Sequence, residues 1–91
     1  MDTRLLQKEI VKFKKSKGFN VDVKNLATEF CLLNGEVAEA FEAWFKNDTE
    51  NFPSELADIA IYLLGIAEIA GVDLGNEIDK KMQINYNRSW K

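Results

Sequence analysis

The sequence predicts an all-α protein, in the form of an antiparallel bundle of about four helices. Apolar residues recur at spacings of three and four in several long segments, as they do along one side of a helix. One proline and five glycines among 91 residues leave those segments almost unbroken. The connections between them are short, so consecutive helices should pack antiparallel. We expect residues 1–91 to form one domain, since this length suffices for no more.

The first predicted helix covers residues 3–17. Leu6, Ile10 and Phe13 are spaced by four and three residues, and they should form its buried stripe. Gly18 follows directly and is expected to end the helix, because glycine readily adopts the left-handed conformation found after a helix.

The second predicted helix covers residues 22–46 and carries the clearest apolar stripe of the chain. The stripe consists of Leu26, Phe30, Leu33, Val37, Phe41 and Trp44. Because these residues repeat at spacings of three and four, we expect them to face the protein core. The polar residues 47–51 that follow predict a loop.

The third predicted helix begins at Pro53, a residue suited to the first helical position, and runs to about Ala70. Apolar residues surround almost its whole circumference. Such a helix must be buried on several sides, and in so small a domain we expect one of those sides to contact another subunit. After Gly71, the fourth predicted helix starts near Asp73, a good N-cap, and runs to about Trp90.

The composition excludes several classes of protein. The chain has no histidine, which excludes Ser-His and Cys-His catalysis, the usual zinc sites and ferritin-like di-iron sites. Cys31 is the only cysteine, so it cannot form an intrachain disulfide, and we expect it to be a small buried residue. The net charge of -3 argues against a protein that coats a nucleic acid polymer. No signal peptide is evident, and the longest apolar run is far shorter than the ~20 residues of a membrane span, so we expect a cytoplasmic protein that does not bind membranes.

Two pairs of acidic residues do not fit a plain bundle. Glu36 and Glu39 are three residues apart in the second helix, and Glu55 and Asp58 have the same spacing in the third. If the two helices pack antiparallel, all four carboxylates can meet, and a divalent cation would offset their repulsion and burial. Oxygen ligands without histidine or cysteine favour magnesium, with manganese as a substitute. The alternative is that both pairs are exposed surface acids, with Glu55 placed favourably for the helix dipole.

The fourth helix carries a stripe that begins apolar and turns basic. The stripe consists of Leu74, Ile78, Lys81, Asn85 and Arg88. A core stripe would normally stay apolar, so Lys81, Asn85 and Arg88 are candidates to bind an anion, such as a phosphate, held over the metal. The alternative is that the helix frays at its end and exposes these residues to solvent.

These residues together resemble the MazG-like family of all-α nucleoside triphosphate pyrophosphohydrolases. The matching segments are Gly-Glu-Val-Ala-Glu-Ala at 35–40, Glu-Leu-Ala-Asp-Ile-Ala-Ile-Tyr-Leu-Leu at 55–64, Gly-Val-Asp-Leu at 71–74 and Lys-Lys-Met-Gln-Ile-Asn-Tyr-Asn-Arg at 80–88. They occur in the family's order over about residues 26–90. Each short motif is common by itself, whereas the ordered set is specific.

The resemblance implies cleavage between the α and β phosphates of a nucleoside triphosphate, to give a monophosphate and pyrophosphate. It implies magnesium binding by the four acids Glu36, Glu39, Glu55 and Asp58. It also implies triphosphate binding by Lys81, Asn85 and Arg88, and a homodimer or homotetramer with sites near subunit contacts. Glu36 or Glu39 could serve as the general base. The chain departs from many relatives at Leu32, Leu33 and Asn34, where they carry further acids, which leaves the number of metal ions and the general base open.

Three alternatives remain at the level of sequence. Phe41, Trp44 and Phe45 lie one to two turns beyond the acids and could stack on a nucleobase, although the first two also fall on the predicted core stripe. The substrate could instead be a phosphoribosyl-linked nucleotide or dUTP. Finally, the chain could be a non-catalytic dimeric helical interaction module of the same fold, which would gain no stability from a divalent metal.

Overall fold

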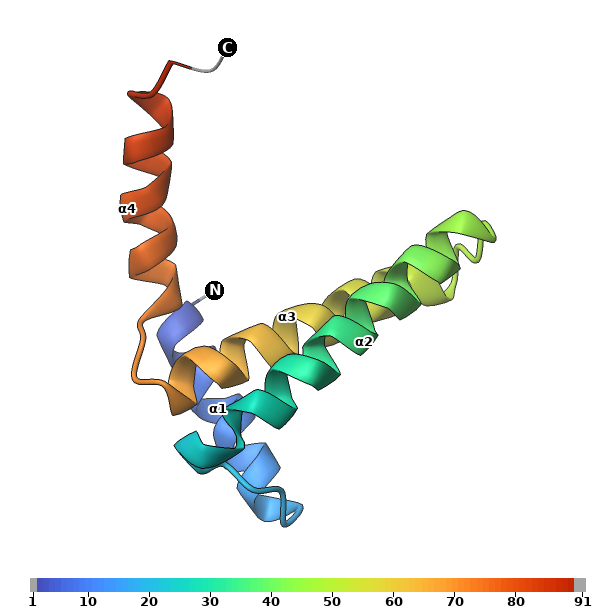
Figure 1. Ribbon diagram of the computed structural model, residues 1–91, viewed down its shortest axis with the longest axis horizontal. Coiled ribbons are helices and arrows are strands. Elements are labelled where there is room, and N and C mark those ends of the chain that lie inside the picture. Colours follow the sequence, from blue (N-terminus) through green and yellow to red (C-terminus); the bar gives the residue numbers. More distant parts are fainter. Residues whose placement is uncertain (1, 90–91) are drawn as a thin grey trace.

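The protein is helical throughout the part of the chain that its computed structural model describes, residues 2–89, and no strand occurs there (Figure 1). The elements are α1 (Thr3–Ser16), a short 3-10 helix η1 (Val23–Asn25), α2 (Leu26–Phe45), α3 (Asn51–Ile69) and α4 (Leu74–Tyr86). The all-α class predicted from the sequence is therefore confirmed. None of these helices has the length and apolar character needed to cross a membrane.

Three of the helices end in the same way. The second residue after the last helical residue has a positive φ, which is 79° at Gly18, 58° at Asn47 and 76° at Gly71. The next residue then donates its backbone N–H to the carbonyl five positions earlier, over 2.8–3.0 Å. The predicted ends at Gly18 and Gly71 are confirmed, and asparagine, which tolerates the left-handed conformation, ends α2.

Aspartate side chains bind backbone N–H groups at the starts of α3 and α4. α3 begins at Asn51, two residues before the predicted start at Pro53, because the Asp48 carboxylate accepts hydrogen bonds from the backbone and side-chain N–H groups of Asn51, at 3.2 and 2.7 Å. Pro53 still lies in the first turn, where its missing N–H has no helical partner to lose. The predicted N-cap of α4 is confirmed, since Asp73 accepts a hydrogen bond from the backbone N–H of Asn76 at 3.2 Å.

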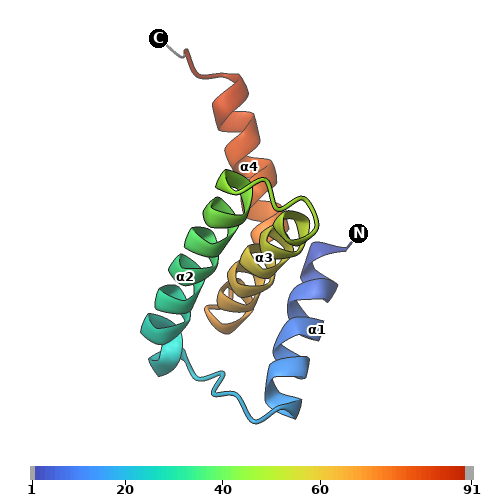
Figure 2. The ribbon, with the colours of Figure 1, turned by 90° about the vertical axis from the view of Figure 1, so that its right-hand side faces the viewer.

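The helices form an extended hairpin with one crossing helix and one projecting helix. α2 and α3 lie side by side and antiparallel, α1 packs against α3 near the base of the hairpin, and α4 leads away from the hairpin (Figures 1 and 2). Within residues 2–89, the only extensive contact of α4 is with α1. α4 ends at Tyr86, earlier than predicted, so Arg88 lies beyond the helix, and Trp90 lies outside the described residues.

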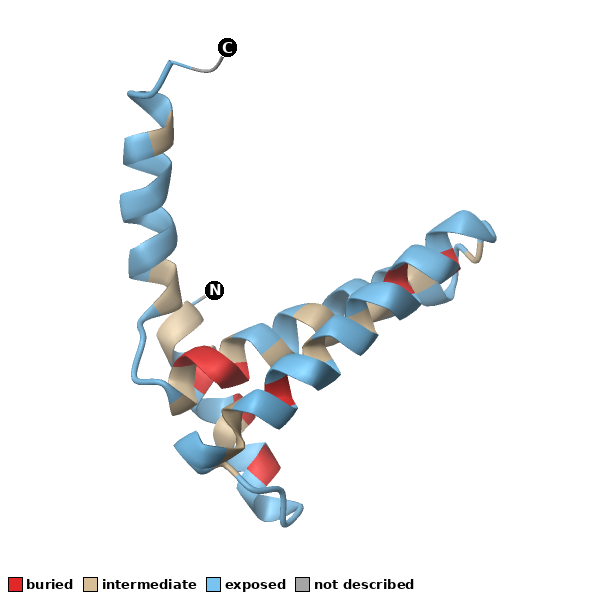
Figure 3. Ribbon diagram, viewed as in Figure 1, coloured by how far each residue is buried: buried red, intermediate tan, exposed pale blue. Residues whose placement is uncertain are grey.

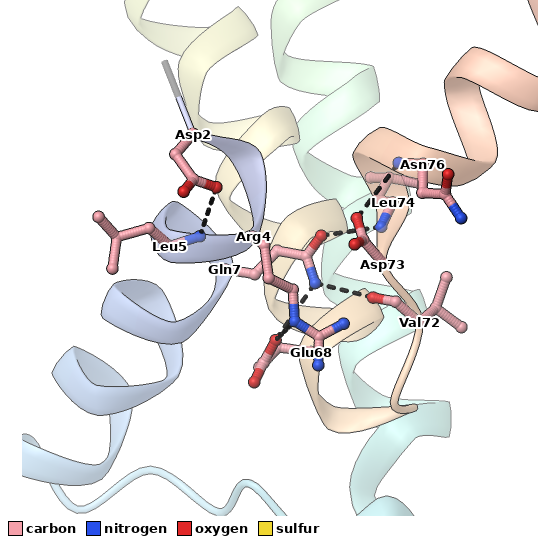
Figure 4. A network of polar contacts seen from close by, with 9 residues as sticks. All are labelled: Asp2, Arg4, Leu5, Gln7, Glu68, Val72, Asp73, Leu74 and Asn76. Carbon is pink, nitrogen blue, oxygen red and sulfur yellow. Dashed lines mark hydrogen bonds and ion pairs between the residues drawn. The ribbon is translucent and has the colours of Figure 1, made fainter.

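The direction of α4 is set by a buried glutamine of α1. Gln7 is completely buried, and its side-chain amide donates to the carbonyl of Val72 at 2.8 Å and to Glu68 at 3.2 Å. Its side-chain oxygen accepts the backbone N–H of Leu74 at 2.9 Å, and Arg4 forms an ion pair with Glu68 at 3.6 Å (Figure 4). These bonds hold the turn between α3 and α4 against α1.

The buried faces of α1 and α2 differ from the predicted stripes. On α1 the buried residues are Gln7, Ile10 and Lys14, whereas Phe13 is 56% exposed. On α2 the fully buried residues are Glu29, Ala40 and Ala43. Most of the predicted core stripe of α2 is exposed instead, namely Phe30, Val37, Phe41 and Trp44 (Figure 3). The small alanines allow α3 to approach closely, and the bulky residues lie to one side of that contact.

The third helix is only partly covered. Gly65, Ile66 and Ala67 are buried, whereas Leu56 and Leu63 are 48% and 41% exposed. Helical periodicity places the exposed leucines beside the exposed stripe of α2, on one side of the hairpin. We call this surface the open apolar face; it comprises Phe30, Val37, Phe41, Trp44, Leu56 and Leu63.

Candidate metal centre

The hairpin brings three of the four predicted acids together. Glu36 and Glu39 lie one turn apart on α2, and Glu55 lies in the second turn of α3. One carboxylate oxygen of each lies within 4.8 Å of the other two. Asp58, one turn further along α3 and half-buried, lies outside this group, but its charge raises the pKa values of Glu36 and Glu55. The four acids therefore share one electrostatic environment.

Two oxygens of this cluster have no hydrogen-bond partner. Glu36 Oε2 and Glu55 Oε2 are buried, and no described residue donates to either. Burial raises the pKa of both carboxyl groups, and Glu39 raises it further, through a hydrogen bond and its charge. The one lysine lining the adjoining hollow, Lys46, pairs with Glu42. Buried carboxylate oxygens without a donor are costly, and a divalent cation bound by oxygen ligands would satisfy them.

The acid cluster opens into a hollow of about 220 Å³ beside the turn between α2 and α3. Its lining residues are Glu39, Glu42, Ala43, Lys46, Asp48, Asn51 and Glu55. Four of these seven residues are acidic. This composition suits a cation and, once a cation is bound, the phosphates of a ligand.

A second hollow of about 280 Å³ lies between α1 and the hairpin, and no sequence pattern predicted it. Besides Lys14, Glu29 and Tyr62 it is lined by Phe13, Phe19, Asn20, Asn25, Thr28, Leu32 and Ile61. Leu32 and Glu39 are two helical turns apart, so both hollows open on the same side of α2. That side is opposite the open apolar face.

A buried ion pair forms part of the lining of this second hollow. Lys14 Nζ lies 2.9 Å from Glu29 Oε1, and both residues are buried. The same ammonium lies 4.7 Å from the centre of the Tyr62 ring. Burial raises the pKa of Tyr62, as do the charges of Glu29 and Glu36. The sequence signal for Tyr62 was its position one turn after Asp58 on the same side of α3.

The predicted anion-binding residues do not meet the acids within one chain. Lys81 is exposed on α4, Asn85 is half-buried there, and Arg88 follows the end of the helix. Because α4 leads away from the hairpin, it carries all three away from Glu36 and Glu55 (Figure 1). Of the aromatic residues considered for base stacking, Phe41 and Trp44 belong to the open apolar face, and Phe45 is exposed and contacts Phe41.

Comparison with known proteins identifies one similar segment. Over 37 residues, which are 41% of this chain, the sequence is 49% identical to a dATP/dGTP diphosphohydrolase of Salmonella phage PMBT28. The matched segment is 13% of the length of that relative. The chain matches no protein-family model. It also has no significant match among solved structures.

Proposed function

We propose that the protein is a magnesium-dependent nucleoside triphosphate pyrophosphohydrolase, which cleaves between the α and β phosphates. The observation that carries this proposal is the cluster of Glu36, Glu39 and Glu55, with its two buried and unpartnered oxygens. The similarity of one segment to a protein named as a dATP/dGTP diphosphohydrolase supports the same chemical class.

The acids would bind the metal, and one of them would also accept a proton. Glu36, Glu39, Glu55 and Asp58 would hold magnesium, with manganese as a substitute. When bound, the metal supplies charge neutralisation and Lewis-acid chemistry for a polyphosphate. Glu36 or Glu39 would take the proton of the attacking water. Lys81, Asn85 and Arg88 lie away from the acids within one chain, so they would bind the polyphosphate and stabilise the charge of the leaving pyrophosphate only in an oligomer.

The second hollow is the place for the nucleoside part of the substrate. It opens on the same side of the hairpin as the acids, and Tyr62 connects the two regions. Its aromatic residues Phe13 and Phe19 offer stacking surfaces, while Asn20 and Asn25 offer amide groups to the edge of a base. These features favour a nucleotide, rather than inorganic polyphosphate, as the substrate.

The test is a panel of the eight common nucleoside triphosphates with magnesium, scored for products. We expect a monophosphate and pyrophosphate from at least one of them, and no release of inorganic phosphate. Release of phosphate and a diphosphate would contradict cleavage between the α and β phosphates. The non-catalytic interaction module predicts no turnover and no rise in melting temperature with magnesium.

We also propose that the working form is a homodimer, or a homotetramer built from it, held by the open apolar face. Four large side chains of α2 and two leucines of α3 lie exposed on one side of the hairpin. A contiguous apolar surface of this kind is typical of a subunit contact. A second hairpin would cover it by forming a four-helix arrangement with a common core.

Phe41→Glu should therefore convert the protein to a monomer at micromolar concentration. Phe41 is 61% exposed and contacts Trp44 and Phe45, with ring centres 6.0 Å apart, so a charge there would disrupt the centre of the contact. Leu5→Glu is the matched control, since Leu5 is 57% exposed on α1, away from this face. Light scattering would show a dimer for the control. A monomeric wild-type protein would disprove the contact.

A further inference from the structure

The second hollow carries a pair of opposite charges at its inner end. Lys14 and Glu29 are the only charged residues among the described residues that line it, and they are 8% and 4% exposed. Three apolar residues of the lining lie further out, since Phe13, Phe19 and Leu32 are each at least 46% exposed. A ligand that enters between these apolar side chains therefore meets the charged pair with its leading edge.

The charged pair is held in one position by its surroundings. Lys14 Nζ donates a hydrogen bond to Glu29 Oε1 at 2.9 Å and lies 4.7 Å from the centre of the Tyr62 ring. A Cβ atom added at Gly65 would lie 3.6 Å from the same Nζ, so the ammonium packs against α3 where that helix has no side chain. Contacts with two other helices thus fix the orientation of both groups, as the selective binding of a ligand requires.

Both groups of the pair keep hydrogen-bonding capacity. An ammonium has three N–H donors, and within residues 2–89 only Glu29 accepts a hydrogen bond from Lys14. None of these residues donates to the second carboxylate oxygen, Glu29 Oε2, although Glu29 is buried. Because buried polar groups without partners are costly, a ligand that bonds to them would be stabilised here. The pair offers such a ligand one donor, Nζ, followed by two acceptors, Oε1 and Oε2.

Guanine matches this order of donor and acceptors. Its Watson–Crick edge presents the carbonyl oxygen O6, then the N1–H donor, then the N2 amino group. Uracil and thymine have one N–H donor between two carbonyls, and adenine and cytosine have one amino group beside a ring nitrogen that accepts. Only guanine, of these five bases, places two neighbouring donors beside a carbonyl. We propose that Lys14 and Glu29 select a guanine nucleotide, with Nζ donating to O6 and the carboxylate accepting from N1 and N2.

The separation of this pair from the acid cluster fits the same placement. Glu29 and Glu36 are seven residues apart on α2, so they lie on the same side of the helix and about 10 Å apart along it. The sugar and first phosphate of a nucleotide cover such a span, so a base at Glu29 would direct its phosphates toward Glu36. The inference rests on the proposed function, because that function places a nucleoside in the second hollow.

Binding of nucleoside monophosphates to the wild-type protein tests base selection without relying on turnover. By calorimetry, we expect the guanosine compound (GMP) to bind about 10–100-fold more tightly than the inosine compound (IMP), which lacks only the N2 amino group. The xanthosine compound (XMP) should also bind more weakly than GMP, because its second carbonyl would face the Glu29 carboxylate.

The two proposals fail in different ways. Equal binding of GMP and IMP, or equal turnover of all nucleoside triphosphates, would disprove the selection of guanine and leave the proposed function intact. Tighter binding of GMP than of IMP and XMP, without turnover of any triphosphate, would support the selection of guanine and disprove the proposed function.

Glu29→Gln separates base selection from a purely structural ion pair. The glutamine oxygen still accepts from Lys14, so the amide N–H₂ takes the place of Oε2 and an acceptor becomes a donor. Because xanthine has a carbonyl where guanine has its N2 amino group, the variant should bind XMP more tightly than GMP, the reverse of the wild-type order. Glu9→Gln, exposed on α1, is the matched control and should keep the wild-type order.

Circular dichroism shows whether the Glu29→Gln protein is folded. A folded variant that still binds GMP more tightly than XMP would disprove the inference, since the ion pair would then be structural only. The comparison of GMP with IMP needs no variant, and it decides the question if Glu29→Gln does not fold.

Discussion

Glu36→Gln is expected to reduce turnover at least about a hundredfold, since changing even an indirect partner of a bound metal lowers activity 10–100-fold. Glutamine keeps the shape of the side chain, but it removes one negative charge and one strong oxygen ligand from the cluster. Stabilisation by a ligand follows its affinity for the folded protein, so the rise in melting temperature with magnesium should also largely disappear. Thermal unfolding with and without magnesium, together with a pyrophosphate assay, measures both effects.

Without metal, the Glu36→Gln variant should also differ from the wild-type protein in how its stability depends on pH. Burial, together with Glu39, raises the pKa of Glu36 above its ordinary value of 4.5. A carboxyl group whose pKa is raised by folding binds its proton more tightly in the folded state. Its contribution to stability is therefore complete below the unfolded pKa and is lost as the pH rises through the folded pKa. Without metal, wild-type stability relative to Glu36→Gln should fall as the pH rises from about 4.5 toward 7.

Glu9→Gln is the control, because it makes the same charge change on an exposed part of α1. It should keep both turnover and the response to magnesium. If Glu36→Gln turned over substrate normally and was strongly destabilised without metal at pH 7, Glu36 would be a structural residue and the metal assignment would be wrong.

Lys14→Met should strongly destabilise the protein. It removes the ammonium group that lies 2.9 Å from Glu29, and Glu29 is only 4% exposed. Breaking a buried ion pair by removing one partner costs about 3–5 kcal/mol, because the remaining charge stays buried without compensation. For a domain of this size, such a loss lowers the melting temperature by more than about 10 °C. Urea unfolding followed by circular dichroism measures the free energy directly.

The double variant Lys14→Met/Glu29→Met separates the loss of the pair from the loss of packing. Replacing both charges with apolar side chains removes the unpaired carboxylate, so most of the lost stability should return. Lys12→Met provides the matched control, since Lys12 is exposed on the same helix. A Lys14→Met protein as stable as the Lys12→Met protein would show that the ion pair contributes little.

Features that are decided by residues close together in the sequence could be predicted from it. Gly18 and Gly71 end helices because glycine adopts a positive φ without strain, and Asp73 caps a helix with its own carboxylate. The approach of Glu36 and Glu39 to Glu55 also follows from local information. Residues three apart share a helix face, and a short turn between two helices requires an antiparallel pair.

Buried faces could not be predicted in the same way. The apolar stripe of α2 that contains Phe41 was expected in the core, but the close contact with α3 is made by Ala40 and Ala43. Periodicity shows which residues share a face, and it does not show which face another helix will cover. Cys31 was also expected to be buried, and it is exposed.

The helices, the ends of two of them at Gly18 and Gly71, and the pairing of the acids were already encoded in short stretches of chain, because hydrogen bonds and side-chain spacing within a few residues decide them. The course of α4 and the burial of Lys14 depended on contacts between distant residues. Gln7 bonds to Val72 and Leu74, 65 and 67 positions away, and Lys14 meets Glu29 across two helices. Such contacts exist only after the helices have packed, so only the three-dimensional structure shows that Lys81 lies away from the acids of its own chain.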